Sequence, residues 1–525
     1  MNFRHLVCPL FFVLVTSPVF AEVRLPAVFS DHMVLQSGVS APVWGWAAAD
    51  EKIKLEIDGK SAEATAGKDG KWRAKLPELK TGGPHKLVIT GANRIEIDDV
   101  LVGEVWLGSG QSNMGMKVNA AKDFEKEKAA AELPLIRVFD TGMQNTPEPS
   151  EDCKGRWTLC SPETVGAFSA SAFFFGRELH RELKVPVGLI VSAVGGTPID
   201  SWVDRSLQEA APEMKGFFAA QAAEGAEVDP AKEKAAFDAA MKRWQEDAKK
   251  ARAEQKPLPR RPRNQADVRA RKSNLGGLFN GMIMPLAPYA IRGAIWYQGE
   301  ANTVPSKAPY YEYQLAMLVN DWRKRWGAEF PMAWVQLPNY AGIGRDIPQV
   351  REAMFKTLRL PKTGMAITID IGETNNIHPK NKQEVGRRLA QWALATVYAK
   401  SGVESSGPLP AKHELRGGEI VVSFTHARGL IAKGGEPTGF QIAGEDQKWQ
   451  PATAKIVGET VVVSSPAVAT PVAVRYAWEN DPKCNLYNEA GIPASPFRTD
   501  EWKIEPPAVP APGASGAPRG KRRTK

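Results

Sequence analysis

The loop around Ser112 carries residue types that suit a nucleophile. It reads Gly-Ser-Gly-Gln-Ser-Asn-Met over 108–114 and follows a mostly apolar run at 100–107. A serine at a glycine-rich turn between a strand and a helix presents its hydroxyl above the sheet, and its backbone N–H can stabilise developing negative charge. A phosphate-binding loop is excluded, because Met116 stands where that motif needs lysine. Taken on its spacing alone, a glycine-rich turn of this kind is usually structural.

A base for this serine can be sought among the seven histidines. His378 follows an apolar run of strand length and precedes a helical pattern. The others lie in a leader segment, in the strand-rich ends of the chain or in mid-helix, namely His5, His32, His85, His180, His413 and His426. A neutral imidazole at the same sheet edge as Ser112 can accept the serine proton, although a lone histidine is more often structural.

Two further loops suit the stabilisation of an oxyanion. The first contains Gly195 and Gly196, whose backbone N–H groups can approach a substrate oxygen. The second contains Gln298 and Asn302, which offer side-chain amide donors. Either loop alone is also consistent with a turn or a polar cap, so the argument for catalysis lies in the ordered occurrence of all four loops.

The elements that position these loops alternate along the middle of the chain. Apolar runs of strand length lie at 100–107, 185–191, 291–297, 332–337 and 365–371, and helical patterns at 170–183, 310–326, 350–358 and 380–399. This alternation predicts an α/β fold whose parallel sheet is covered by helices on both faces. Ligands of such sheets bind beyond the carboxyl ends of the strands, where the four loops are expected.

Short motifs recur in order along the chain. They are Gly-Gln-Ser-Asn-Met at 110–114, Gly-Gly-Thr-Pro-Ile at 195–199, Trp-Tyr-Gln-Gly-Glu at 296–300 and Ile-His-Pro-Lys-Asn-Lys-Gln at 377–383, with further matches at 25–30, 483–488 and 493–498. Together they resemble the sialate O-acetylesterase family of SGNH-type (GDSL-type) serine hydrolases. The resemblance covers nearly the whole chain apart from a central insertion and the two ends.

The resemblance implies a flavodoxin-like SGNH hydrolase domain flanked by β regions, and deacetylation through an acyl-enzyme without a cofactor. By position, Ser112 is then the nucleophile and His378 the base. The backbone N–H groups of Ser112 and Gly196 would form the oxyanion hole. Gln298 is the preferred side-chain donor, with Asn302 second.

One departure from the family pattern concerns the third member of the triad. SGNH enzymes usually have an aspartate three residues before the histidine, and relatives often have an acid just before Ile-His-Pro. In this chain the two positions are Asn375 and Asn376. A neutral amide can hold an imidazole tautomer, but it cannot stabilise an imidazolium as a carboxylate does. Asp370 and Glu373 are alternative orienting residues, and a Ser–His dyad oriented by a backbone carbonyl is another solution.

The remaining segments predict a multidomain chain. Residues 22–100 and 404–505 carry short alternating runs separated by turn residues, typical of β-sandwich-like regions on either side of a hydrolase domain at 101–403. Residues 207–272 interrupt that domain as a helical, basic insertion. The Pro-, Ala- and Gly-rich stretch at 506–525 predicts a disordered basic tail.

Residues 1–21 predict a secretory signal peptide. Arg4 precedes an apolar run at 6–15 and a small-x-small cleavage site at 19–21. This run is too short for a membrane anchor, which needs ~20 residues, and no later segment is predicted to span a bilayer. We therefore expect an exported protein, periplasmic or extracellular.

Cysteine usage and charge add weaker constraints. Export permits a disulfide, so Cys153 and Cys160 could close a small loop and leave Cys484 unpaired, or all three could be buried thiols. The net charge is +9, but basic residues concentrate in the tail and the insertion. Without interleaved aromatic residues these segments do not indicate a nucleic-acid partner, and no cysteine–histidine cluster predicts a metal.

The predicted function is removal of O-acetyl groups from sialic acids through a serine acyl-enzyme. Nothing in the loops identifies the sugar, so an acetylesterase acting on plant polysaccharide, such as xylan or pectin, is the nearest alternative. A glycan-binding protein that has lost catalysis is a third, favoured by the β regions, which could serve binding, and by the missing acid before His378.

Overall fold

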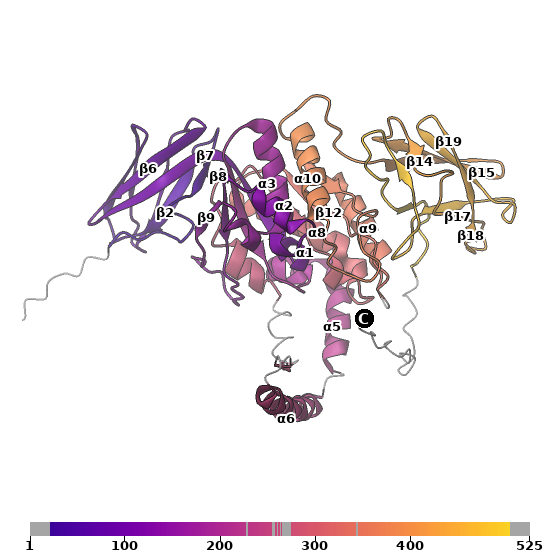
Figure 1. The fold of residues 1–525 in the computed structure, drawn as a ribbon, viewed down its shortest axis with the longest axis horizontal. Coiled ribbons are helices and arrows are strands. Elements are labelled where there is room, and N and C mark those ends of the chain that lie inside the picture. Colours follow the sequence, from indigo (N-terminus) through magenta and orange to yellow (C-terminus); the bar gives the residue numbers. More distant parts are fainter. Residues whose placement is uncertain are drawn as a thin grey trace, which may run out of the picture.

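The computed structural model describes residues 22–226, 229–254, 258–259, 261–262, 264, 275–342 and 345–504. The predicted signal peptide, the predicted tail and most of the Pro- and Arg-rich end of the insertion lie outside the described residues. An N-terminal β region, a central α/β region and a C-terminal β region follow one another along the longest axis of the molecule (Figure 1).

The central sheet is parallel except at one edge. Its strand order is β13-β12-β11-β7-β10-β8-β9, and β9 runs antiparallel to β8. The strands are β7 (Arg94–Gly110), β8 (Leu133–Asp140), β9 (Trp157–Cys160), β10 (Val187–Ala193), β11 (Gly293–Tyr297), β12 (Met332–Val335) and β13 (Thr363–Ala366). The predicted α/β architecture with a parallel central sheet is confirmed, because β7, β8 and β10–β13 pair in parallel.

The last strand of this sheet is shorter than predicted. The apolar run at 365–371 predicts a strand, but β13 ends at Ala366. Its neighbour β12 ends at Val335, which pairs with Ala366, so the later residues have no strand beside them to continue the ladder. Residues 367–371 instead lead into the loop that carries His378.

Helices cover both faces of the sheet. They are α3 (Ala170–Leu183) and α10 (Lys382–Thr396) on one face, and α8 (Tyr311–Trp326) and α9 (Ile347–Lys356) on the other. Alternate side chains of β11 enter opposite cores: Ile295 and Tyr297 join the cluster of α3 and α10. Trp296 faces the other way, with its ring centroid 5.9 Å from those of Trp202 and Trp322. Burial on both faces explains the near-continuous apolar runs in the sequence.

Strand β7 joins the N-terminal β region to the central sheet without a break. Its first part pairs with β6 and β1, and residues 104–110 pair with β10. The strands of this region are β1 (Val34–Gln36), β2 (Pro42–Trp46), β3 (Lys52–Ile57), β4 (Lys60–Thr65), β5 (Lys71–Lys75) and β6 (Gly82–Thr90). Because one strand belongs to both regions, the site at the end of β7 is anchored on a long, rigid element.

The C-terminal region contains two four-stranded antiparallel sheets. One has the order β14-β15-β20-β19 and the other β18-β17-β21-β23. Their bounds are β14 (Leu409–Arg416), β15 (Glu419–Thr425), β19 (Thr453–Val457), β20 (Thr460–Ser464), β17 (Phe440–Ala443), β18 (Gln450–Pro451), β21 (Ala473–Tyr476) and β23 (Phe497–Arg498), beside a small pair of β16 (Ile431–Ala432) and β22 (Leu486–Tyr487). Side chains from both four-stranded sheets fill one hydrophobic cluster, as Val422 and Val474 illustrate.

Beyond the loop that follows β10, the described part of the segment between β10 and β11 is mainly helical. It contains α4 (Arg205–Ala210), α5 (Lys215–Ala226) and α6 (Pro230–Ala253). Asp229 caps α6 by accepting hydrogen bonds from the backbone N–H groups of Ala231 and Lys232, at 2.9 and 3.2 Å. Figure 1 shows α6 standing away from the central sheet, so this helix does not build the sheet edge that bears the predicted site.

The three cysteines of the described chain are free thiols. Cys153 and Cys160 are buried and Cys484 is half-buried. Burial raises the pKa of the Cys153 and Cys160 thiols to about 12, so both stay protonated at neutral pH. No helix within the described ranges has the length and apolar character needed to cross a bilayer.

Gly110, at the end of β7, generates the first prediction. Its φ is +138°, and an added Cβ would lie 2.2 Å from the carbonyl oxygen of Tyr297. Gly110→Ala should therefore lower the free energy of unfolding, measured by urea titration, by about 1–3 kcal/mol or more. Gly115→Ala is the matched control, since its Cβ would meet Ala193 at an ordinary 3.8 Å. Equal stability of the two variants would contradict the strain at Gly110.

Candidate active site

Ser112 and His378 meet at the carboxyl edge of the central sheet. Ser112 is the first residue of α1 (Ser112–Gly115), the short helix that follows β7. The Nε2 atom of His378 lies 2.8 Å from the Oγ atom of Ser112, which is hydrogen-bond distance. Ser112 is half-buried and His378 is exposed, so a substrate can reach both. The pair has the geometry of a nucleophile with its general base.

The loop before His378 is folded by its own polar side chains. The carboxylate of Glu373 accepts hydrogen bonds from Asn376 Nδ2 at 2.9 Å and from the backbone N–H of Lys380 at 2.8 Å. Asn376 in turn accepts from the backbone N–H of His378 at 3.0 Å and donates to its carbonyl oxygen at 2.9 Å. These contacts fix the backbone that carries the imidazole rather than the ring itself.

None of the four orienting candidates is seen to form a hydrogen bond with the imidazole among the described residues. Asp370 forms an ion pair with Arg388, at 2.6 and 2.9 Å, and Asn375 is exposed. Glu373 and Asn376 hold the backbone of the loop. Within the described residues, the one hydrogen-bond partner of the His378 ring is Ser112, which gives a Ser–His pair without a carboxylate.

The electrostatic surroundings keep His378 neutral. Partial burial and the nearby ammonium of Lys382 both lower the pKa of His378 below its ordinary value. A neutral imidazole can accept the serine proton, whereas an imidazolium cannot. The environment of His378 therefore suits a general base at neutral pH.

The loop after β10 brings its glycines next to the nucleophile. The backbone N–H of Val194 donates to the carbonyl oxygen of Gly110 at 3.1 Å, which ties this loop to the end of β7. A Cβ added at Gly195 would lie 3.5 Å from Ser112 Cβ. Gly196 has a φ of +73°, a conformation that favours glycine. This arrangement places the Gly195–Gly196 backbone beside Ser112, as an oxyanion hole requires.

Gln298 and Asn302 are fully buried and join the loops to one another. Gln298 Nε2 lies within hydrogen-bond distance of Gln111 Oε1 (3.1 Å), the Thr197 carbonyl (3.1 Å) and Asn302 Oδ1 (2.8 Å). Asn302 Oδ1 also accepts from the backbone N–H of Ile199 at 2.9 Å. The amide hydrogens of Gln298 thus point at buried acceptors in this conformation, and both residues brace the loops that flank Ser112.

Three further residues, which we did not predict as site residues, lie beneath the Ser–His pair. Asn113 Nδ2 donates to a carboxylate oxygen of Glu300 and to the Ile377 carbonyl, the latter at 3.0 Å. Its Oδ1 accepts from Lys382 Nζ at 2.6 Å. Burial raises the pKa of Glu300 and lowers that of Lys382 to about 7. The only sequence signal for these residues was their place inside the motifs that carry Ser112, Gln298 and His378.

Metal ligands are not grouped in the described part of the chain, where no three His, Cys, Asp or Glu side chains come together as a candidate site.

A comparison with models of known families shows to which family the chain belongs. The model of a family described as carbohydrate esterase, sialic acid-specific acetylesterase, matches residues 102–253 and 276–395, which is more than half of the chain. The chain belongs to this family. The matched residues include Ser112, His378 and the loops that brace them, so the esterase family model covers the whole geometric site.

Relatives along the full chain agree with this assignment. The sialate O-acetylesterase of Rattus norvegicus is 28% identical, over 90% of this chain and 94% of that protein. The sialate O-acetylesterase of Homo sapiens is 27% identical, over 90% of this chain and 92% of that protein. A carbohydrate acetylesterase from Xanthomonas citri superposes with a TM-score of 0.78 at 34% identity, over 91% of this chain and 100% of that one. The predicted family and the prediction of an esterase are confirmed.

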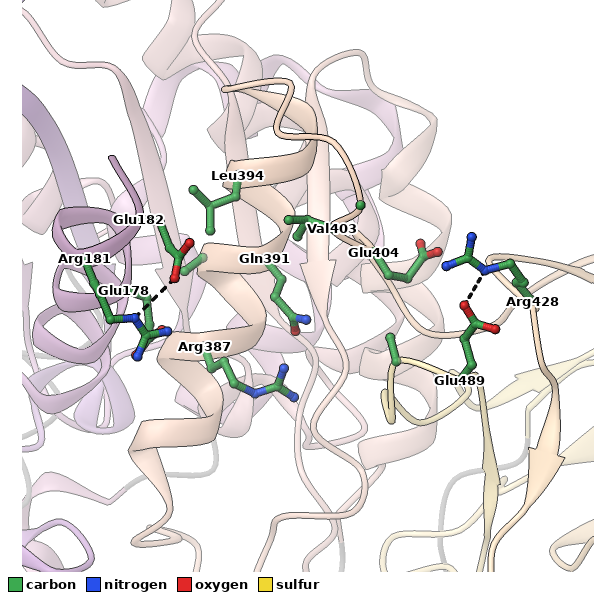
Figure 2. A pocket seen from close by; sticks show the side chains of 13 residues that line it. Glu178, Arg181, Glu182, Arg387, Gln391, Leu394, Val403, Glu404, Arg428 and Glu489 are labelled. Carbon is green, nitrogen blue, oxygen red and sulfur yellow. Dashed lines mark hydrogen bonds and ion pairs between the residues drawn. The ribbon is translucent and has the colours of Figure 1, made fainter. Parts of the chain in front are cut away.

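A charged groove of about 520 Å³ lies elsewhere on the esterase, where α3 and α10 face the C-terminal β region. Figure 2 shows its glutamate and arginine side chains, with Arg181 directed at Glu182 and Arg428 at Glu489. None of its lining residues belongs to the Ser–His pair or to the loops around it. This groove is therefore separate from the candidate active site.

The place of Asp370 can be tested by Asp370→Asn. Asp370 and Glu384 both pair with the buried Arg388, so the variant leaves one carboxylate partner in place, and we expect it to lose about 1–3 kcal/mol of unfolding free energy. Labelling of Ser112 by a serine-directed organophosphate should continue at the parent rate, since Asp370 does not touch His378. Glu312→Gln, which removes a surface partner of Arg359, should change neither quantity. Slower labelling with unchanged stability would place Asp370 in the catalytic unit.

Proposed function

We propose that this esterase removes O-acetyl groups from a carbohydrate through an acyl-enzyme on Ser112. The observation that carries the proposal is the 2.8 Å contact between Ser112 Oγ and His378 Nε2 at the open edge of the sheet. A hydroxyl becomes a nucleophile when an adjacent base accepts its proton. The contact also disfavours a purely glycan-binding protein, because binding alone does not require a serine aligned with an imidazole.

The acylation step follows from this geometry. His378 Nε2 takes the proton from Ser112 Oγ while Oγ forms a bond to the acetyl carbonyl carbon. The electron pair of the carbonyl moves to its oxygen, which the backbone N–H groups of Ser112 and Gly196 receive. The ester C–O bond then breaks, and the sugar oxygen takes the proton from His378. Water repeats the sequence on the acyl-enzyme and releases acetate.

The strand order supports the proposal of an SGNH-type, flavodoxin-like domain. With β8 and β9 taken as an extension of one edge, the remaining strands lie in the order β10-β7-β11-β12-β13. In chain order this is 2-1-3-4-5, the flavodoxin-like arrangement, in which ligands bind at the carboxyl edge. We regard the flanking β regions as sandwich-like supports of that domain.

Sialic acids are the proposed substrate class, on the strength of the sialate O-acetylesterases that match along the full chain. The alternative is an acetylated plant polysaccharide such as xylan or pectin. The structure from Xanthomonas citri, which is 34% identical and is named a carbohydrate acetylesterase, is compatible with either substrate class. Either substrate fits an exported enzyme, which the signal-peptide pattern at residues 1–21 favours.

The mature protein and its Ser112→Ala variant give the primary test. We expect the parent to release acetate from 9-O-acetyl sialic acid, and the variant to lose activity by roughly 10⁶-fold, to background. Acetylated xylan and pectin run in parallel decide between the substrate classes. Turnover retained by Ser112→Ala would overturn the nucleophile, and binding of these sugars without turnover by the parent would favour the non-catalytic alternative.

The pH dependence of kcat/KM tests the base. His378 must be neutral to act, so activity rises as the pH increases through its pKa. Because burial and Lys382 lower that pKa, the acid limb should reach half-height below the ordinary value of 6.5. A limb centred at or above 6.5, measured with a non-ionising acetyl ester, would contradict this environment for His378.

A further inference from the structure

The ionisable side chain of Lys382 lies buried next to the loops of the catalytic pair, and the reaction just described makes no use of it. Lys382 and Asn113 are fully buried and Glu300 is 7% exposed. Lys382 Nζ lies 2.6 Å from Asn113 Oδ1, its one hydrogen-bond partner in the described chain, and 5.1 Å from the centre of the Tyr297 ring. A buried ammonium is unfavourable unless it is paired, so its presence in this core calls for a physical reason.

The contacts of Asn113 supply that reason. Both hydrogens of its amide are engaged, one by Glu300 and one by the carbonyl of Ile377, and its oxygen accepts from Lys382. Ile377 immediately precedes His378, and Asn113 immediately follows Ser112. The amide therefore joins the nucleophile loop to the histidine loop by a direct hydrogen bond. An amide that rotated would lose all three contacts, so Lys382 and Glu300 hold it in the orientation that reaches Ile377.

We propose that Lys382, with Asn113 and Glu300, forms a buried positioning unit that holds the His378 loop over Ser112. This proposal rests on the catalytic pair of the proposed function and extends it to residues that do not touch the substrate. A triad carboxylate orients the imidazole by bonding to the ring. Here the ring has no carboxylate partner among the described residues, and the unit instead holds the backbone next to His378, through the hydrogen bond from Asn113 to the Ile377 carbonyl.

The same unit acts on His378 electrostatically. Glu300 faces Lys382 from the loop after β11 and Glu373 faces it from the histidine loop, and both favour its charged form. Arg345 acts on Glu300 in turn. The ammonium of Lys382 lowers the pKa of His378, so its removal should raise that pKa. A side chain that served packing alone would leave the pKa of His378 where it is.

The discriminating experiment is Lys382→Met, which keeps much of the side-chain volume and removes the charge and the hydrogen bond. We expect kcat on 4-nitrophenyl acetate to fall about 100-fold with little change in KM, the scale of a small misplacement of a catalytic group. The acid limb of the pH profile should move to higher pH. Lys382→Arg restores the positive charge, so its limb should return toward that of the parent even if its larger side chain lowers kcat.

Lys380→Met is the matched control. Lys380 is an exposed lysine in the histidine loop, two positions before Lys382, and its hydrogen bond to Glu373 comes from its backbone N–H, which the substitution keeps. We expect this variant to keep both the kcat and the pH profile of the parent. Circular dichroism and the thermal midpoint of each variant report the folded fraction to which the rates are normalised.

A substrate-independent readout separates this inference from the proposed function. The pH dependence of Ser112 labelling by a serine-directed organophosphate depends on the Ser–His pair and not on the identity of the sugar. A parent that is labelled but releases no acetate would overturn the proposed function. The pH profiles of labelling in the parent and in Lys382→Met would still test the positioning unit. An unshifted profile in Lys382→Met, with a loss of rate no greater than its loss of folded protein, would overturn the positioning unit.

Discussion

The active edge of this esterase depends on one buried amide. Parallel strands converge at their carboxyl ends, but they leave the loops that follow them free to diverge. Asn113 counters this by bonding to the loop of Glu300, to the Ile377 carbonyl of the histidine loop and to Lys382 at the start of α10. Because these contacts are made away from water, each unmet bond would cost free energy, and the three loops are held in one arrangement.

The residues around this amide are supported by a strand that is shared between two regions of the protein. Strand β7 belongs to the N-terminal β region at its beginning and to the central sheet at its end, where it delivers Ser112. Gln298 and Asn302 brace the neighbouring loops through hydrogen bonds that are fully buried. The nucleophile is thus placed by long-range pairing and by buried polar contacts, while its own helix α1 is only four residues long.

The acidic residues near the site bond to the histidine loop or to an arginine, and not to the imidazole. Glu373 folds the histidine loop through Asn376 and the Lys380 backbone, and Asp370 neutralises Arg388. The imidazole is left with Ser112 as its partner, in surroundings that lower its pKa. A base with a lowered pKa is mostly neutral at physiological pH, so proton acceptance does not require a carboxylate, although the imidazolium formed during the reaction lacks that stabilisation.

The sequence by itself determined the family and the α/β alternation, with five strands and four helices of the central region, because apolar periodicity and contiguous motifs are local properties of the chain. Strands β8 and β9 of the same sheet were not predicted. It also pointed to Ser112 and His378, since each follows a strand-length apolar run. Only the tertiary structure decided where strand β13 ends, which depends on its neighbour β12, and what Asp370 and Gln298 contact. The roles of Asn113 and Lys382 likewise depend on residues more than 180 positions away, as with Asn113 and Glu300, and no local pattern encodes such contacts.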